Sequence, residues 1–165
     1  MPLVGLLALG RAESTWRRRA ERWGDRTKVA LSAIATNDWE VLRIVYDDIQ
    51  QRLPNDISFG YGQVSIVLAA RHGLGDGGWD GLLTARSALF DGKTNLRIMA
   101  NHYRNTLDIA LQREPSLTGD DLLLAGMCIY NGGDVPGRSA WYDDKYAANI
   151  MAYRAAIEWA HELVG

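Results

Sequence analysis

The sequence predicts one mainly α-helical domain, and three observations lead to this fold class. The chain has 165 residues, a length that suits a single domain with one hydrophobic core. Apolar residues recur at intervals of three and four along most of the chain, which is the period of a helix with one buried face. No long run alternates between apolar and polar residues, as a half-buried strand would. We therefore expect helices throughout and at most a small β-hairpin, near residues 55–62.

The first predicted helix occupies residues 1–10 and leads into Glu13. Its expected apolar face consists of Leu3, Leu6, Leu7 and Gly10. The stretch is too short to span a membrane, and it lacks the positively charged start of a signal peptide. We interpret it as a core helix of the domain.

Two further helices are expected between residues 28 and 53. The first covers residues 28–36, and Asn37 with Glu40 resembles the capping box that starts the second. An apolar stripe at helical spacing follows, made of Trp39, Leu42, Tyr46, Ile49 and Leu53. Pro54 ends this helix because proline cannot continue the backbone hydrogen bonding.

The remaining helices follow after a loop at residues 55–62. A short helix at 63–72 precedes a glycine-rich turn, which lacks the Lys-Ser/Thr ending of a phosphate-binding loop. We then expect helices at 79–90, 94–113 and 120–130, with Thr118 as the cap of the last of these. The final helix carries a +4, +3, +4, +3, +4 series of apolar residues: Tyr146, Ile150, Tyr153, Ile157, Ala160 and Val164.

Composition excludes several classes of function. The formal net charge of -2 is unlike the strongly basic face of a nucleic-acid-binding domain. His72, His102 and His161 show no ligand spacing, so neither a metal nor another cofactor is expected. No apolar run reaches the length of a membrane span. The single Cys128 excludes an intrachain disulfide and is expected to be a small buried hydrophobe.

One local charge bias stands out, an arginine-rich stretch between Arg11 and Arg26. The simpler interpretation is a solvated helix face. The alternative is attraction of this stretch to an anionic polymer.

Three short segments have the residue types for chemistry on sugars. Glu13, in Ala12-Glu13-Ser14, ends an apolar helix, where poor solvation of the charged form would raise its pKa into the range of a general acid. A surface Glu in an arginine-rich turn is the alternative. In Phe59-Gly60-Tyr61-Gly62-Gln63, two glycines allow close approach of the backbone beside a ring and an amide, although an ordinary turn has the same composition. Tyr130-Asn131-Gly132-Gly133 either lines a cleft or is a plain helix C-cap.

Taken in order, these motifs resemble the goose-type lysozyme and soluble lytic transglycosylase superfamily. Its members carry a catalytic Glu followed by Ser, then Gly-Leu-Met-Gln, then Ala-Tyr-Asn-Gly-Gly, then a Tyr near the final helix. The corresponding residues here are Glu13-Ser14, Gly60–Gln63, Ile129–Gly133 and Tyr146 with Asn149, Ile150 and Tyr153. Thr94-Asn95-Leu96 with Tyr103 is similar to a further helix of the family. The resemblance spans Leu3 to Tyr153 and implies a lysozyme-like domain over residues 1–165.

The chain departs from the family pattern mainly in one gap. The stretch from Glu13 to Gln63 is longer than usual, which implies a helical insertion at about 28–53. Gly62 also stands where the family has Met, and Ile129 where it has Ala. If the insertion lay earlier, Asp47 or Asp48 would be the rival acid, but the Ala-Glu-Ser context favours Glu13.

The resemblance implies cleavage of the β-1,4 bond between N-acetylmuramic acid and N-acetylglucosamine. Glu13 would protonate the glycosidic oxygen and then act as base. The residues implied to bind substrate or to order the cleft are Ser14, Ser58, Tyr61, Gln63, Tyr130, Asn131 and Tyr146. The partner would be the glycan strands of peptidoglycan, met by a monomer at the bacterial cell wall, whether periplasmic, extracellular or phage-delivered.

Several alternatives stay open at the level of sequence. A lytic transglycosylase needs one carboxylate and forms a 1,6-anhydro product, whereas an inverting hydrolase needs a second carboxylate, for which Asp56 is the candidate. The loop 134–142, with Arg138 and Trp141, would flank the groove. A catalytically inactive module that binds wall glycan or builds a phage or secretion structure is the non-enzymatic alternative. A chitinase-type or chitosanase-type hydrolase is the third.

Overall fold

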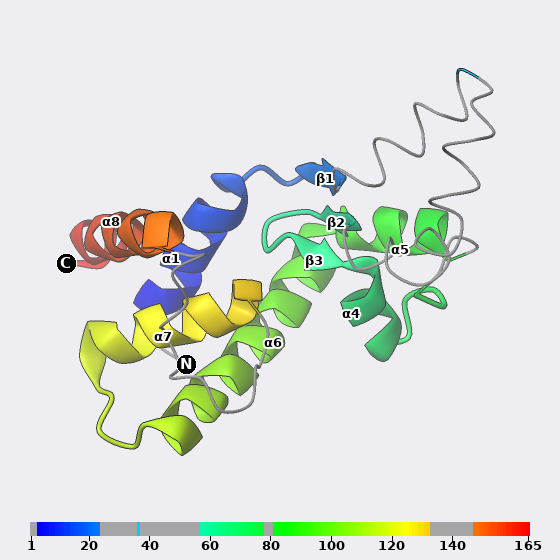
Figure 1. The fold of residues 1–165 in the computed structure, drawn as a ribbon. Helices are drawn as coiled ribbons and strands as arrows, with labels where there is room; N and C mark the ends of the chain where they lie inside the picture. The colour runs from blue at the N-terminus through cyan, green and yellow to red at the C-terminus, as the bar shows by residue number, and fades with distance from the viewer. Residues whose placement is uncertain (1–2, 24–35, 37–56, 78–80, 133–146) are drawn as a thin grey trace. The chain divides into compact units, whose positions relative to one another are not determined.

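The computed structural model describes residues 3–23, 36, 57–77, 81–132 and 147–165, and this part of the chain is mainly helical (Figure 1). The described residues form six helices and one three-stranded antiparallel sheet. The mainly α class is therefore confirmed. In chain order the elements are α1 (Leu3–Ser14), β1 (Glu21–Trp23), β2 (Ile57–Phe59), β3 (Val64–Ser65), α4 (Ile66–Arg71), α5 (Leu82–Leu89), α6 (Gly92–Arg113), α7 (Gly119–Gly132) and α8 (Ala147–Val164).

The chain divides into two compact units. The first comprises Met1–Trp16 with Met99–Gly165, and the second comprises Arg17–Ile98. The expected insertion at 28–53, Asp56, the loop 134–142 and Tyr146 lie outside the described residues. None of the described helices is both long and apolar enough to cross a membrane.

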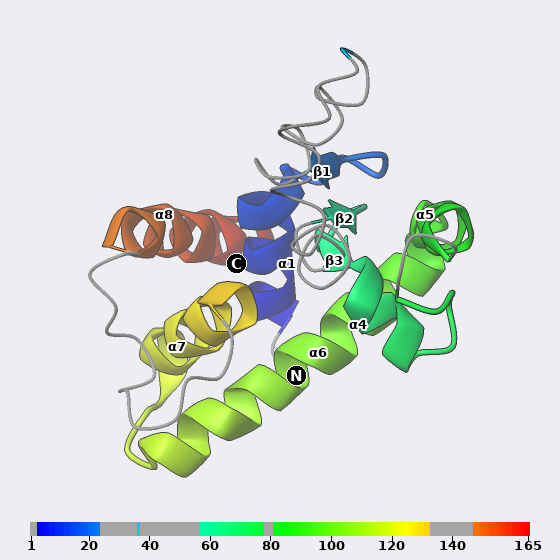
Figure 2. The same ribbon diagram turned by 45° about the vertical axis from the view of Figure 1, so that its right-hand side comes forward.

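In the first unit, α1 packs along α8, and α8 also contacts α7 (Figure 2). The predicted apolar face of α1 is confirmed only at Gly10, because Leu3 is 58% exposed and Leu6 and Leu7 are half-buried. The other buried residues of the helix are Gly5, Ala8, Leu9 and Ser14. A Cβ built at Gly5 would lie 2.9 Å from the Tyr103 hydroxyl oxygen and from Leu123 Cδ2. Small side chains thus allow close helix packing, which the positions of the leucines do not indicate.

The core of this unit is formed largely by α6 and α7. Tyr103 is fully buried, and its hydroxyl donates a 2.9 Å hydrogen bond to the carbonyl oxygen of Leu123. A Cβ built on Gly126 would lie 2.6 Å from Leu107 Cδ2, so this glycine lets α6 and α7 approach each other. The sequence predicts an apolar stripe on α6 at Leu96, Met99, Tyr103, Leu107 and Leu111, and it is confirmed at its centre, where Met99, Tyr103 and Leu107 are buried.

The C-terminal helices match their predicted periodicity with shifted ends. Tyr153, Ile157 and Ala160 are buried on α8, whereas Val164 is 45% exposed at the frayed end. Helix α7 continues through Asn131 and Gly132, which the sequence assigned to the following loop. Tyr130 and Asn131 therefore lie in the last turn of a helix.

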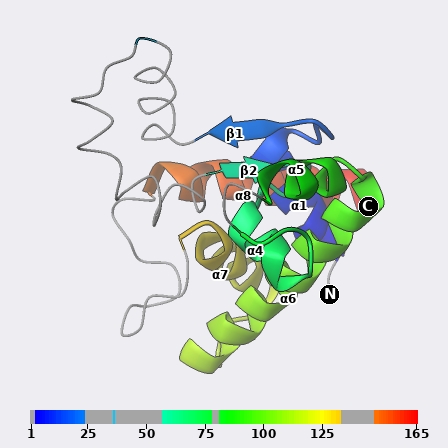
Figure 3. The ribbon, with the colours of Figure 1, turned by 90° about the vertical axis from the view of Figure 1, so that its right-hand side faces the viewer.

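The second unit is built around the sheet, in the strand order β1-β2-β3, and Figure 3 shows β1 beside β2. The hairpin expected near 55–62 is present as β2 and β3, with Ser58 opposite Ser65. The prediction of at most one small hairpin was wrong. Strand β1 adds a third strand to the sheet, in which Arg22 pairs with Ser58 of β2. Three residues are too few to show alternation in sequence, and only the pairing with β2 makes Glu21–Trp23 a strand.

The two short helices of this unit begin later than predicted. Residues 64–65 are strand, and α4 starts at Ile66 with Ser65 as its N-cap, whose Oγ accepts a 3.1 Å hydrogen bond from Leu68 N. Helix α5 starts at Leu82, where Asp76 Oδ1 accepts a 2.9 Å hydrogen bond from Gly81 N. A side-chain cap therefore decides where α4 starts, whereas the N-cap of α5, Gly81, is held by its backbone hydrogen bond to Asp76.

Candidate functional site

Glu13 lies in the last turn of α1 and is half-buried. Directly after it the helix ends in a backbone conformation that is unusual for non-glycine residues, because Thr15 and Trp16 have φ values of 51° and 59°. The helix end is closed by hydrogen bonds from Thr15 N to Arg11 O (2.9 Å) and from Trp16 N to Gly10 O (3.2 Å). Left-handed conformations of this kind cost about 1–3 kcal/mol each and persist only where surrounding contacts enforce them.

The contacts that enforce this turn come from α1 itself. The Trp16 ring lies against Gly10, since a Cβ built there would be 2.5 Å from Trp16 Cζ2. The buried Ser14 hydroxyl donates a 3.2 Å hydrogen bond to the Gly10 carbonyl oxygen. Ser14 therefore shapes the helix end beside Glu13 through this bond. The position of Glu13 follows from a fixed turn rather than from a free helix terminus.

Tyr130, near the end of α7, is electrostatically coupled to Glu13. Burial of the hydroxyl raises the pKa of Tyr130 well above its usual value, and the negative charge of Glu13 and the neighbouring Tyr153 raise it further. Helices α1, α7 and α8 thus each contribute one polar side chain to the same place, which we name the Glu13–Tyr130–Tyr153 cluster. Tyr130 remains a neutral hydrogen-bond donor at physiological pH, because ionisation beside a carboxylate in a buried position is strongly disfavoured.

His102 of α6 extends this cluster. Its ring centroid lies 4.8 Å from that of Tyr130, with the two ring planes at 52°. From the sequence, His102 was considered only as a possible metal ligand, and its ring contact with Tyr130 was not predicted. The sequence contains one indication that His102 lies near the core: it immediately precedes the buried Tyr103 on α6 and so borders the apolar stripe.

A second group of predicted residues forms a loop in the second unit, at residues 59–63. Ser58 Oγ donates a 3.1 Å hydrogen bond to Gln63 Oε1, and Gln63 Nε2 donates one of 3.1 Å to the Gly60 carbonyl oxygen. Gln63 has a φ of 44°, again left-handed. Both ends of its side-chain amide are therefore engaged inside the loop.

Asn95 of α6 holds the same loop from the inside, and it is fully buried. Its Oδ1 accepts a 3.0 Å hydrogen bond from Gly62 N, and its Nδ2 donates one of 2.9 Å to the Phe59 carbonyl oxygen. Gly60 has a φ of 77°, and a Cβ built there would lie 2.2 Å from Asn95 Nδ2. In the sequence Asn95 was noted only as part of the resemblance; an amide on the buried face of an amphipathic helix could have indicated this role.

Tyr61 is half-buried near the tip of this loop. A Cβ built on Gly92, the first residue of α6, would lie 3.2 Å from Tyr61 Cε2. The ring is therefore placed against the start of the helix. Because Gly92 has no side chain, there is room for the Tyr61 ring at this position.

The predicted site residues fall into these two groups. Glu13, Ser14, Tyr130 and Asn131 belong to the first unit, and Ser58, Tyr61 and Gln63 belong to the second. Asp56 and Tyr146 lie outside the described residues. Tyr153 is coupled to Tyr130 together with Glu13, whereas the resemblance implied Tyr146 as the tyrosine of the site.

Metal ligands and the Cys128 thiol are the other groups that could carry chemistry. Within the described ranges, no three side chains of the His, Cys, Asp or Glu type gather as a metal would require. Cys128 is half-buried, and burial raises the pKa of its thiol to about 11. A thiol of this kind is largely protonated near neutral pH and is a weak nucleophile.

Comparisons with known proteins return no match for this chain among family models, curated proteins or solved structures. Function is therefore inferred from the residues and contacts described above.

Proposed function

We propose that this chain is a lysozyme-like enzyme that cleaves the glycan strands of peptidoglycan, with Glu13 as the catalytic acid and base. One observation carries the proposal: Glu13 stands half-buried in the last turn of α1, where a left-handed turn at Thr15 and Trp16 and the Ser14–Gly10 hydrogen bond fix the helix end. Glu13 and Ser14 belong to the motifs that resemble the goose-type lysozyme and lytic transglycosylase superfamily. A mainly helical chain with a small antiparallel sheet is consistent with that resemblance.

The surroundings of Glu13 suit a group that must give and then regain one proton. Tyr130 stays protonated, so its phenol presents a neutral donor rather than a second negative charge. We infer that this donor orients the Glu13 carboxylate, because general acid catalysis requires correct orientation first. The left-handed turn at Thr15 and Trp16 adds rigidity to the helix end that carries Glu13.

In the proposed reaction, Glu13 gives its proton to the oxygen of the leaving N-acetylglucosamine as the C1–O bond of N-acetylmuramic acid breaks. In transglycosylation the 6-hydroxyl of the same muramic acid attacks C1, its proton passes to the Glu13 carboxylate, and a 1,6-anhydro ring forms. In hydrolysis water takes the place of that hydroxyl. An inverting hydrolase would need a second carboxylate about 6.5–9.5 Å away, and Asp56 is the candidate for it.

We propose that the loop at 59–63 binds sugar. Asn95, Gly60 and Gln63 hold it in one conformation. A loop ordered before binding loses less conformational entropy when it meets a ligand. Tyr61 is the side chain of this loop that we assign to contact with a sugar face.

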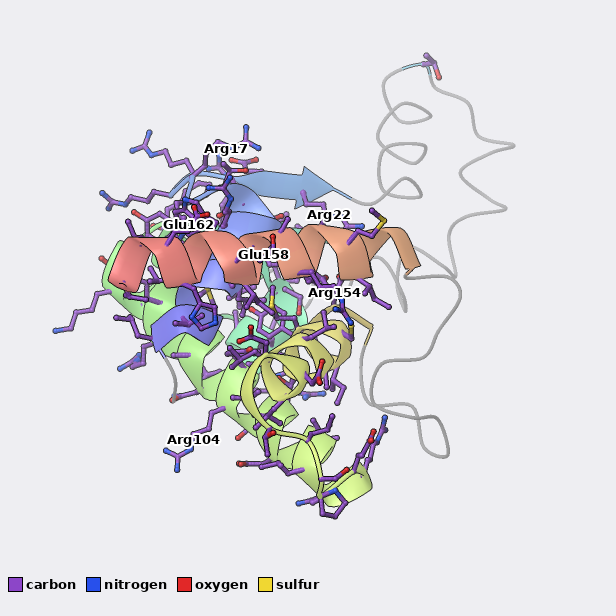
Figure 4. All side chains as sticks on the ribbon, turned by 90° about the vertical axis from the view of Figure 1, so that its left-hand side faces the viewer. Arg17, Arg22, Arg104, Arg154, Glu158 and Glu162 are labelled. Carbon is purple, nitrogen blue, oxygen red and sulfur yellow. The ribbon has the colours of Figure 1, made fainter. Side chains whose placement is uncertain are left out.

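The test is clearing of purified peptidoglycan sacculi, followed as loss of turbidity. We expect Glu13→Gln to reduce the initial rate by a factor of about 10²–10⁴, the usual contribution of general acid catalysis. Glu158→Gln is the matched control, because Glu158 is exposed on α8, as Figure 4 shows, and lies outside the cluster. Circular dichroism verifies that both variants fold.

The outcomes separate the alternatives. Clearing by Glu13→Gln at the wild-type rate would remove Glu13 from the mechanism. Clearing by neither protein, with wild-type binding to sacculi, would favour a non-catalytic wall-binding module. Cleavage of chitin oligomers in place of sacculi would favour a chitinase-type enzyme. Mass spectrometry of the products distinguishes the two reactions, because an anhydro product is lighter than the hydrolytic one by one water.

A further inference from the structure

The segment from Arg17 to Arg22 concentrates positive charge in the second unit. It contains four arginines and one glutamate, in a chain whose formal net charge is -2. All four arginines are exposed, and Figure 4 labels the first and the last of them. This is the stretch for which the sequence favoured a solvated helix face. It is instead a turn followed by strand β1.

The backbone of the Arg17–Arg22 segment is held in place at several points. Ala20 N donates a 3.1 Å hydrogen bond to Arg17 O, and Ala20 O accepts one of 2.8 Å from Gly60 N. Arg22 pairs with Ser58 across the sheet. Arg18 Nε donates a 2.7 Å hydrogen bond to the Phe90 carbonyl oxygen. The segment therefore displays its guanidinium groups from an ordered backbone, which lowers the entropy cost of binding a ligand.

Among the described residues, two acidic side chains interact with arginines around this segment. Glu21, the acid within the segment, is engaged by Arg86, whose Nε donates a 3.1 Å hydrogen bond to Glu21 Oε1. Arg86 brings a further positive charge and lies 4.8 Å from the centroid of the Phe90 ring. Hydrogen bonds from Thr94 lower the pKa of Asp91, and the charges of Arg18 and Lys93 lower it further. Within the Arg17–Arg22 segment itself, four arginines stand against one glutamate, so the segment is net positive.

We propose that the Arg17–Arg22 segment binds the phosphodiester groups of a flexible polyol-phosphate polymer, such as a glycerol-phosphate chain. Guanidinium groups match phosphate oxygens in bidentate geometry and stay charged at all physiological pH values. This inference does not depend on the activity assigned to Glu13. It concerns a surface of the other unit and a ligand of other chemistry.

Two other polyanions fit the segment less well. Single-stranded nucleic acids bind through bases stacked on aromatic rings as well as through phosphates, and no residue from Arg17 to Arg22 is aromatic. Membrane surfaces hold proteins through apolar side chains inserted beside basic ones, and Ala20 is the single apolar residue of the segment. A ligand recognised by charge alone along a flexible chain is the remaining class.

The experiment measures binding of fluorescently labelled poly(glycerol phosphate) at 50 mM and 200 mM salt. We expect Arg19→Gln with Arg22→Gln to weaken binding about 25-fold, since one arginine near a polyanion contributes about a fivefold change. The salt dependence should also become shallower, because fewer counterions are released. The matched control is Arg104→Gln with Arg154→Gln, two exposed arginines on α6 and α8 (Figure 4). We expect it to bind like the wild type.

Two further arms complete the design. Oligo(dT) and vesicles of phosphatidylglycerol in phosphatidylcholine are offered to the wild type at the same phosphate concentration. Weaker binding to both than to the polyol phosphate supports the proposal, and tighter binding to either overturns it. Equal weakening in the two double variants, or no binding by the wild type, also overturns it. Glu13→Gln should bind the polymer like the wild type, so failure here is distinguishable from failure of the proposed activity.

Discussion

The side-chain amide of Asn95 packs against Gly60 so closely that no side chain at position 60 fits without displacing this amide. A Cβ built on Gly60 would lie 2.2 Å from Nδ2 of Asn95, and the same amide group hydrogen-bonds on both sides of this glycine, to Phe59 O and Gly62 N. Gly60 is in the left-handed region with a φ of 77°. The loop at 59–63 therefore has one conformation, set by a side chain that comes from more than thirty residues away.

Replacing Asn95 by Leu should lower the free energy of unfolding by about 2–5 kcal/mol, because two buried backbone groups lose their partners. Urea denaturation followed by circular dichroism measures the change. Asn101→Leu, an exposed asparagine on the same helix, is the control and should change stability by about 0.5 kcal/mol or less. Equal effects of the two substitutions would contradict the role assigned to Asn95.

Gly60→Ala and Gly73→Ala separate crowding from backbone strain. Both glycines have a positive φ, 77° and 75°, but a Cβ at Gly73 meets nothing within 4 Å. We expect Gly73→Ala to cost about 1 kcal/mol from the left-handed conformation alone. Gly60→Ala should cost several times more, because the Asn95 amide must also move. Thermal denaturation of both variants gives the comparison, and similar losses would show that the contact with Asn95 is not tight.

Tyr130→Phe removes the buried hydroxyl that is electrostatically coupled to Glu13. We expect clearing of sacculi to slow about tenfold or more while the protein stays folded, because the ring and most of its packing remain. The loss should appear in kcat rather than in KM if the hydroxyl orients Glu13. An unchanged rate would place Tyr130 outside the mechanism even if Glu13→Gln is inactive.

Cys128 should react slowly with iodoacetamide in the folded protein. Its pKa is raised from 9.0 to about 11 by burial, so at pH 8 the thiolate fraction is about a hundredfold below that of an ordinary thiol. Alkylation followed by mass spectrometry, with the protein unfolded in urea as the reference, measures the ratio. Equal rates in the two states would show that the thiol is solvated.

The same raised pKa gives stability a pH dependence with a definite sign. Below pH 9 the thiol is protonated in both states, and its contribution to stability is complete. As pH rises from 9 toward about 11 the unfolded state loses the proton first, so the free energy of unfolding falls. The free energy of unfolding of Cys128→Ala should fall less over this pH interval than that of the wild type. Identical slopes of this free energy against pH would contradict the raised pKa of Cys128.

The amino-acid sequence alone determined the helical elements with long apolar stripes. The centre of α6 and most of α8 follow from residues three and four apart, such as Met99, Tyr103 and Leu107. Such a stripe is a local property, since a helix of regular period has to bury it. The Glu13 motif and the glycine loop were also visible as residue types. The sequence could not show which contacts fix the helix end at Glu13 and the loop at 59–63.

Tertiary structure decided the features that depend on distant partners. Strand β1 exists because β2 pairs with it, and α1 buries small residues because Tyr103 and Leu123 lie against Gly5. Asn95 orders a loop more than thirty residues away from it. Each of these contacts joins residues with no regular spacing between them. Periodicity reports only which face of an element is apolar, and the side chain that meets this face is known only once the chain has folded.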